Sequence, residues 1–234
     1  LEELGEEALE ARCGSTSLDG VVHRTVRDLI RELEDEIEAR FPKVMRRVGG
    51  YNLDEFTRGK PFNLAKLIAG SEGTLAMILD VTVRLQEVPK VRMLAMLHYE
   101  TLGAALESVP FINRHGPSAV ELLDEGLFVL GRKNPNLAPL LSWLQGTPAA
   151  VLMVEFDGPD EDSVVREVDG MRSDADVTQR TSYLHEAWTP EQQAEILKFR
   201  KDGLGIYATV DGPFKPTPFI EDAAIPPEHL ATYI

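Results

Sequence analysis

The chain has 234 residues, of which 43% are hydrophobic, and it carries a formal net charge of −15. This length and apolar fraction suffice for a sizeable core and for one large or two ordinary domains. The acidic charge argues against a general surface for nucleic acids or anionic membranes, because phosphate binding requires clustered lysines and arginines. A local cationic pocket and a peripheral contact with a membrane remain compatible with this composition.

Targeting and redox signals are few. No apolar run reaches the length of a membrane-spanning helix, and the acidic first residues, LEELGEEALEAR, lack the pattern of a signal peptide. The single cysteine, Cys13, excludes an internal disulfide and a thiolate metal cluster built from this chain alone. None of the five histidines shows paired metal-ligand spacing, so the sequence predicts no metal site. A reducing, cytoplasmic location fits best.

The N-terminal part begins with helical patterns. Residues 1–12 and 20–40 have helical periodicity, whereas residues 43–61 are irregular and rich in glycine and arginine. Such a loop often carries function, and Tyr51 and Asn52 are its candidate residues. The alternative is a surface connection whose glycines serve turns.

A turn between two glycines follows. Residues 62–85 read FNLAKLIAGSEGTLAMILDVTVRL, in which a helical pattern stops at Gly70 and a predicted strand begins after Gly73. Glycine permits positive φ and close approach of a ligand, so backbone amides can become available in this turn. The turn is therefore a candidate cofactor loop, and a helix C-cap leading into a strand is the alternative.

After Pro89 the pattern becomes β-α-β followed by β-α-β, which predicts an α+β, ferredoxin-like domain with an antiparallel sheet and helices on one face. We place the domain boundary there, giving domains at 1–88 and 89–234. The predicted strands and helices cover residues 91–100, 101–115, 118–124, 149–158, 163–171 and 176–184. A further helix is predicted over 191–201, before a long segment rich in glycine and proline.

Two motifs in order resemble a known family. GYNLDEF (50–56) followed by residues 62–90 resembles the closing segment of the FAD-binding domain in vanillyl-alcohol-oxidase, or PCMH-type, flavoproteins. Within them it is most similar to the FAD-linked oxidases that include D-lactate dehydrogenase, the glycolate oxidase flavin subunit and D-2-hydroxyglutarate dehydrogenase. The ending IEDAAIPPEHL resembles bacterial proteins that fuse such an oxidase to an iron–sulfur domain.

This resemblance implies a fragment of a larger flavoenzyme. The family's glycine-rich pyrophosphate loop and its C-terminal histidine cluster are absent from these residues. Residues 1–88 would be the C-terminal part of the FAD-binding domain, and residues 89–234 would be the cap domain that shapes the substrate pocket. An iron–sulfur cluster and the general base would lie outside this chain.

By resemblance, the reaction is oxidation of a 2-hydroxy acid such as D-lactate, glycolate or D-2-hydroxyglutarate, with hydride passing to FAD. Arg200 and Lys215 would hold the anionic substrate. The residues that the resemblance places against FAD are Gly70, Ser71, Glu72, Gly73, Thr74, Tyr51 and Asn52. The electron acceptor and the oligomeric state are not specified by the sequence.

Several alternatives remain at the level of the sequence. Arg200 could cap a helix C-terminus and Lys215 could be a solvated loop residue. Leu204 stands where the hydroxyglutarate enzymes carry a threonine, which leaves the substrate open. An unlike hypothesis is a non-catalytic ligand-binding or regulatory module, because a ferredoxin-like sheet does not fix function.

Overall fold

The computed structural model describes residues 1–44, 49–203, 205–209 and 223–234. The chain forms two compact units, of which the first comprises Leu1–Arg84 and the second begins at Leu85. Lys215 lies outside the described residues. Within the described part, no helix has both the length and the apolar character needed to cross a membrane.

The first unit is helical. Its helices are α1 (Glu6–Cys13), α2 (Leu18–Arg40) and α3 (Leu64–Ile68). The hydroxyl of Ser17 accepts a hydrogen bond from the amide of Gly20 (3.2 Å), which satisfies one free donor at the start of α2. One core cluster joins α2 and α3 to the 3₁₀ turn at Leu53–Phe56, and it consists of Ile30, Ile37, Phe56, Leu64 and Leu67.

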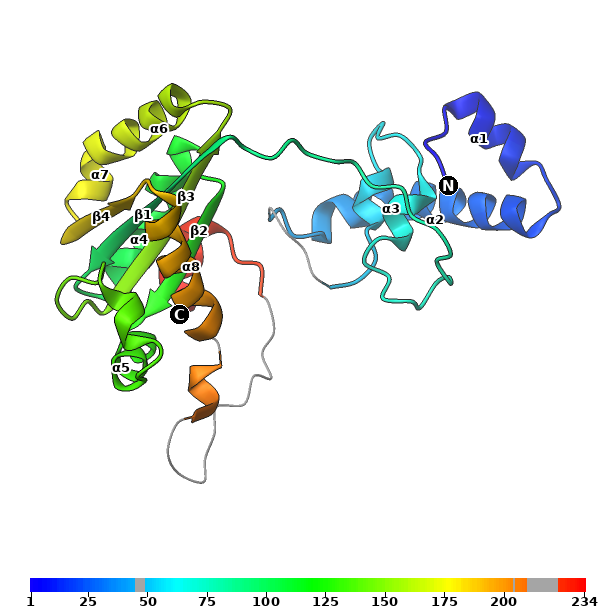
Figure 1. Ribbon diagram of the computed structural model, residues 1–234. Coiled ribbons are helices and arrows are strands. Elements are labelled where there is room, and N and C mark those ends of the chain that lie inside the picture. The colour runs from blue at the N-terminus through cyan, green and yellow to red at the C-terminus, as the bar shows by residue number, and fades with distance from the viewer. Residues whose placement is uncertain (45–48, 204, 210–222) are drawn as a thin grey trace. The chain divides into compact units, whose positions relative to one another are not determined.

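The second unit contains a four-stranded antiparallel sheet (Figure 1). The strand order is β2-β3-β1-β4, so the first and third strands along the chain pair at the centre. This is the order that a split β-α-β unit produces, and the predicted α+β class with an antiparallel sheet is confirmed. The strands are β1 (Val91–Tyr99), β2 (Ala119–Asp124), β3 (Ala150–Gly158) and β4 (Tyr183–Ala187).

The helices cover both faces of this sheet, and here the prediction of helices on one face is wrong. Alternate residues of the central strand β1 point to opposite sides, so that Ala95 and Leu97 belong to one core cluster and Leu94 and Met96 to another. Both faces are apolar and both must be buried. The first face packs against α4 (Leu102–Ile112), α6 (Glu161–Ser173) and α7 (Ala175–Thr178); the second packs against α5 (Glu125–Lys133) and α8 (Pro190–Gly203) (Figure 1).

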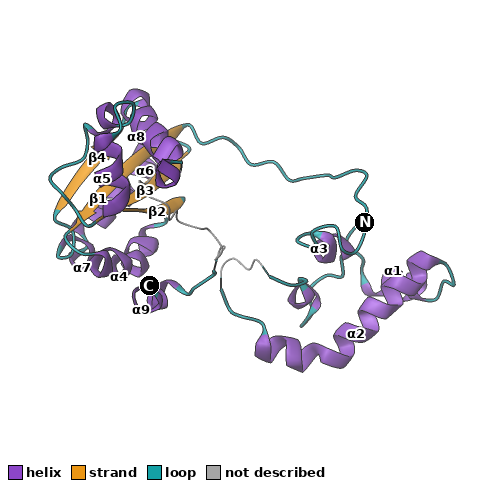
Figure 2. Cartoon of the chain, turned by 90° about the horizontal axis from the view of Figure 1, so that it is seen from below, coloured by secondary structure: helices purple, strands orange, loops and turns teal. Residues whose placement is uncertain are grey.

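Two further predictions differ from the structure. The extended segment predicted at 176–184 begins instead with α7, because the carboxylate of Asp174 accepts from the amide of Asp176 (2.9 Å) and starts a helical turn. The strand predicted after Gly73 belongs to no sheet, and residues 75–90 are loop throughout (Figure 2). Within the described residues no strand pairs with them, and a strand needs a hydrogen-bonding neighbour. The chain's last helix is α9 (Leu230–Tyr233).

A buried histidine lies at the centre of the sheet. The His98 side chain on β1 is 1% exposed, with Nδ1 lying 3.0 Å from the carbonyl oxygen of Met96. Its Nε2 accepts a hydrogen bond from the amide of Gln145 (3.3 Å), which requires that this nitrogen carry no proton. Burial, the larger cause, and nearby His185 both lower the pKa of His98. The ring is therefore held neutral.

This burial predicts a pH-dependent stability. The unfolded chain binds a proton at His98 more tightly than the folded chain, because the folded-state pKa is lowered. The free energy of unfolding should then fall as the pH drops below about 6.5, by up to about 1.4 kcal/mol per pH unit. Urea unfolding at several pH values tests this. His98→Gln should show a shallower slope, and equal slopes in the two proteins would contradict the assignment.

Candidate functional site

The turn that follows α3 has an unusual backbone. Three of its residues have positive φ, namely Gly70 (81°), Glu72 (51°) and Gly73 (76°). Positive φ is unfavourable for a residue with a side chain, so Glu72 is held there by its surroundings. The amide of Thr74 donates to the carbonyl oxygen of Ser71 (3.0 Å) and closes the turn.

This turn presents backbone donors. Within the described residues, the amides of Glu72 and Gly73 donate to no other group, and both residues are exposed. A Cβ built on Gly73 would meet no atom within 4 Å, so the space beside the turn is open. Successive amides near left-handed residues form concavities that bind anionic groups. The turn therefore fits a phosphate or another electron-rich edge of a cofactor.

The structure brings Tyr51 and Asn52 to this same turn. The Tyr51 hydroxyl lies 2.9 Å from Oγ1 of Thr74. Nδ2 of Asn52 donates to the carbonyl oxygens of Ala69 (2.9 Å) and Lys66 (3.2 Å) at the end of α3. Asn52 thus satisfies carbonyls that the helix leaves free. Tyr51 contacts the turn at its last residue, Thr74. Residues predicted separately form one cluster.

Arg200 lies in the second unit, on α8. The buried stripe of this helix consists of Ile196, Phe199 and Gly203, which leaves Arg200 on the flank that faces β2. Its Nε donates to Oε2 of Glu121 on β2 at 2.5 Å. The sequence left open that Arg200 caps carbonyls at the end of the helix. In the structure its hydrogen bond goes instead to a carboxylate 79 positions away.

A second polar pair lies near this one. Oδ1 of Asp124 accepts from the hydroxyl of Tyr207 at 2.5 Å and from the amide of Leu127 at 2.9 Å. The second of these bonds makes Asp124 the N-cap of α5. Burial and the adjacent Asp124 carboxylate raise the pKa of Tyr207, so the phenol keeps its proton. A Cβ at position 126 would lie 3.2 Å from Oδ1 of Asp124, which is a tight contact, and 3.4 Å from the Tyr207 hydroxyl oxygen, which is an ordinary van der Waals contact.

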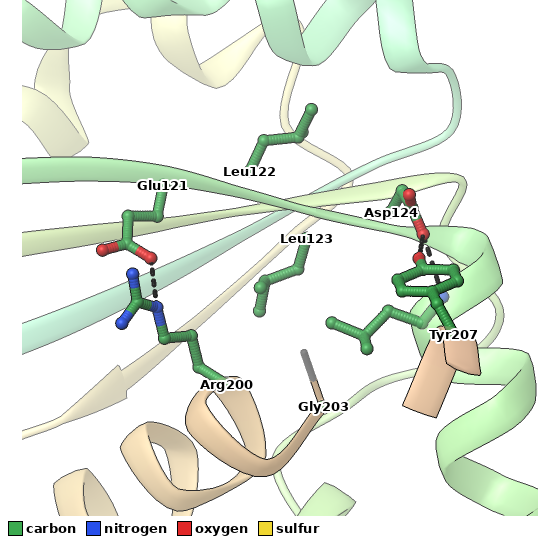
Figure 3. Close-up of a pocket in the computed structure, with 8 residues that line it drawn as sticks. Glu121, Leu122, Leu123, Asp124, Arg200, Gly203 and Tyr207 are labelled. Atoms are coloured by element: carbon green, nitrogen blue, oxygen red, sulfur yellow. Dashed lines mark hydrogen bonds and ion pairs between the residues drawn. The ribbon is translucent and has the colours of Figure 1, made fainter. Parts of the chain in front are cut away.

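A cavity of about 170 Å³ lies between the two pairs. Figure 3 shows Arg200 and Glu121 at one end, Tyr207 and Asp124 at the other, and the apolar Leu123 between them. Its walls also include Leu122, Leu127 and Gly203. An apolar floor with polar groups at its ends suits a small organic acid, whose charged end binds arginine while its carbon chain lies against leucine.

Sequence reasoning missed three of these residues, Glu121, Asp124 and Tyr207. Each polar pair joins β2 to residues about eighty positions later, and a single sequence does not reveal such pairing. A local signal exists only for Asp124, since an aspartate directly before a helical segment is typical of an N-cap.

Comparison with known proteins identifies the second unit. A family model described as FAD linked oxidases, C-terminal domain, matches residues 88–234. The chain belongs to this family. As an FAD-linked oxidase domain, the second unit includes Arg200, Glu121 and the cavity beside them.

Named relatives of this FAD-linked oxidase chain act on hydroxy acids. It is similar to D-2-hydroxyglutarate dehydrogenase of Pseudomonas putida (29% identical over 243 residues, 99% of this chain and 24% of the relative). It resembles the enzyme of the same name from Escherichia coli at 30% over 245 residues, covering 97% of this chain and 24% of that protein. Glycolate oxidase subunit GlcD of Bacillus subtilis is 27% identical over 175 residues, 74% of this chain and 35% of the relative. The chain spans about a quarter of the length of the first two.

Proposed function

We propose that this chain is part of an FAD-dependent oxidoreductase that oxidises a 2-hydroxy acid to the corresponding 2-oxo acid. The observation that carries the proposal is Arg200, which lies beside a small cavity within the FAD-linked oxidase domain. The names of the relatives support the substrate class, because they include dehydrogenases and an oxidase subunit for 2-hydroxy acids.

Arg200 would hold the substrate carboxylate. A guanidinium carries five N–H donors in a planar fork, and within the described residues Arg200 makes one hydrogen bond, to Glu121, which leaves donors for an incoming anion. The leucines of the cavity would pack against the carbon chain and exclude water from it. Lys215 is proposed as the second cation on the basis of sequence alone.

FAD, when bound, would supply the acceptor for the hydride that leaves the substrate Cα. The turn Gly70–Thr74, with Tyr51 and Asn52, would form one wall of its site, because the free amides of Glu72 and Gly73 suit its electron-rich groups. We further propose that residues 1–88 are the C-terminal part of the FAD-binding domain. The single O–H of Tyr207 is donated to Asp124 and its pKa is raised, so Tyr207 would not serve as the base, and the group that accepts the hydroxyl proton would lie elsewhere.

Anaerobic reduction of the flavin tests this proposal. The full-length protein that contains this chain is purified, and its visible flavin absorbance is followed after addition of D-lactate, glycolate or D-2-hydroxyglutarate. We expect at least one acid to bleach the flavin. The matched control is 3-hydroxypropionate, which has a carboxylate but no hydroxyl on the adjacent carbon, and it should leave the absorbance unchanged. A bound flavin that none of the 2-hydroxy acids reduces would refute the proposal.

A further inference from the structure

The guanidinium of Arg200 has a defined orientation. Its Nε donates to Oε2 of Glu121 at 2.5 Å, and Glu121 is its only hydrogen-bonding or ion-pairing partner in the described part of the chain. A bond at Nε engages the side of the guanidinium and leaves Nη1 and Nη2 at its end. That end presents two parallel donors, which is the arrangement that a carboxylate accepts in a bidentate pair.

Glu121 is well placed to fix this orientation. It lies on β2, where its backbone is paired with Met153 of the neighbouring strand β3, so its Cα is fixed by the sheet. Arg200 is on α8, and the first turns of this helix are hydrogen-bonded to the neighbouring backbone. Nε2 of Gln193 donates to the carbonyl oxygens of Arg92 (2.8 Å), Trp188 (3.1 Å) and Ala187 (3.2 Å). Both partners therefore extend from rigid elements.

The Arg200–Glu121 pair lies near a second ion pair on this face of the sheet, and after burial and Asp157 the Glu121 carboxylate also raises the pKa of Glu155. Arg92 has its own partner, Glu155, whose Oε1 lies 3.0 Å from its Nε. Glu121 is therefore not needed to neutralise Arg92. Both members of the Arg200 pair are partly exposed, with 42% of the Arg200 side chain and 34% of the Glu121 side chain accessible. An ion pair this exposed contributes little to folding, so removing its carboxylate should leave the fold intact.

We propose that Glu121 is the positioning residue of Arg200: by accepting from Nε, it fixes the direction in which Nη1 and Nη2 are presented to the carboxylate of the 2-hydroxy acid. This inference rests on the proposed function. An arginine has many side-chain conformations, and a ligand that must immobilise it loses affinity. A carboxylate on a rigid strand restricts the arginine before the substrate arrives.

Two substitutions separate the orientation of Arg200 from the charge of Glu121. Glu121→Gln keeps an oxygen that can accept the Nε–H bond, whereas Glu121→Ala removes the acceptor. The binding probe is oxalate, which has carboxylates but no Cα–H to transfer. In the full-length flavoprotein, we expect Glu121→Ala to weaken oxalate binding and raise the KM of the hydroxy acid by about tenfold, with kcat changed less than about twofold. Glu121→Gln should stay within about threefold of the parent protein.

The controls distinguish positioning from a structural role. Glu195→Ala removes a carboxylate from α8 that contacts Ser142 and not Arg200, and it should leave oxalate binding unchanged. In an Arg200→Ala background, adding Glu121→Ala should cause no further loss, because there is no guanidinium left to orient. Thermal unfolding of each variant shows whether the fold is retained.

Specific results would overturn the inference. Unchanged or tighter oxalate binding in Glu121→Ala would show that the glutamate does not orient the arginine or that it competes with the ligand. If Glu121→Gln lost oxalate affinity about tenfold, as expected for Glu121→Ala, the charge of Glu121 and not its bond to Nε would determine oxalate binding. The proposed function has an independent readout, since bleaching of the parent flavin by a 2-hydroxy acid does not depend on Glu121.

Discussion

Replacing Phe199 by alanine is expected to lower the free energy of unfolding of the second unit by about 3–5 kcal/mol. The ring is fully buried on α8 and stacks on Phe128 of α5, with ring centroids 6.2 Å apart. It also meets Trp143 edge to face at 6.1 Å. Because a Cβ on Gly131 would lie only 2.7 Å from this ring, the pocket is closely shaped to it, and truncation leaves a cavity.

Tryptophan fluorescence during urea unfolding measures this effect. Both tryptophans, Trp143 and Trp188, lie in the second unit, so the signal reports on that unit alone. The control is Val129→Ala, which removes a side chain from α5 whose residue is 44% exposed and should change stability by less than about 0.5 kcal/mol. A loss below about 1 kcal/mol for Phe199→Ala would mean that the core around α8 does not depend on the ring.

Replacing Arg200 by alanine is expected to reduce kcat/KM for the 2-hydroxy acid by roughly 10- to 100-fold, with flavin content unchanged. The estimate corresponds to about 1.5–3 kcal/mol, which is typical for hydrogen bonds to a charged group. The substitution removes the donors that would bind the substrate carboxylate and leaves the carboxylate of Glu121 without its partner. Both changes disfavour an anion at this end of the cavity.

Steady-state kinetics and flavin absorbance of the purified variant check this expectation. Lys198→Ala is the matched control, because Lys198 is a cation on the same helix that pairs with Asp202 and lies away from the cavity. It should retain the kinetics of the parent protein. If Arg200→Ala also turns over at the parental rate and KM, the substrate carboxylate is held by another group.

Much of the second unit could be predicted because its signals are local. The strands β1, β2 and β3 are apolar segments bounded by turn residues, and their alternation with helices predicts the split β-α-β order. Helix α5 was harder to predict, since Gly126 and Gly131 lower the helix propensity of residues 125–133. Gly131 allows the close approach of Phe199, which is a contact that a sequence does not display. The helix predicted at 191–201 corresponds to α8, which with α5 covers the second face, but the sequence does not show on which face of the sheet a helix packs.

The candidate site likewise contains residues that the sequence predicts and others that it does not. The turn at 70–74 is visible in the sequence because glycine marks positive φ, and Tyr51 and Asn52 were predicted from the composition of their loop together with the family resemblance. Their roles against FAD stay predictions. Glu121 escaped prediction because it is one glutamate among many acidic residues, and only the folded chain brings it to Arg200.

The loop at 75–90 has a consequence for handling the isolated protein. Its alternate residues Leu75, Met77, Leu79, Val81, Val83 and Leu85 are all exposed. Exposed apolar side chains in such number promote self-association, and the net charge of −15 opposes it by repulsion between molecules. Salt screens that repulsion over a Debye length of about 8–10 Å at physiological ionic strength. Colloidal stability of this chain should therefore be greatest in dilute buffer at low salt.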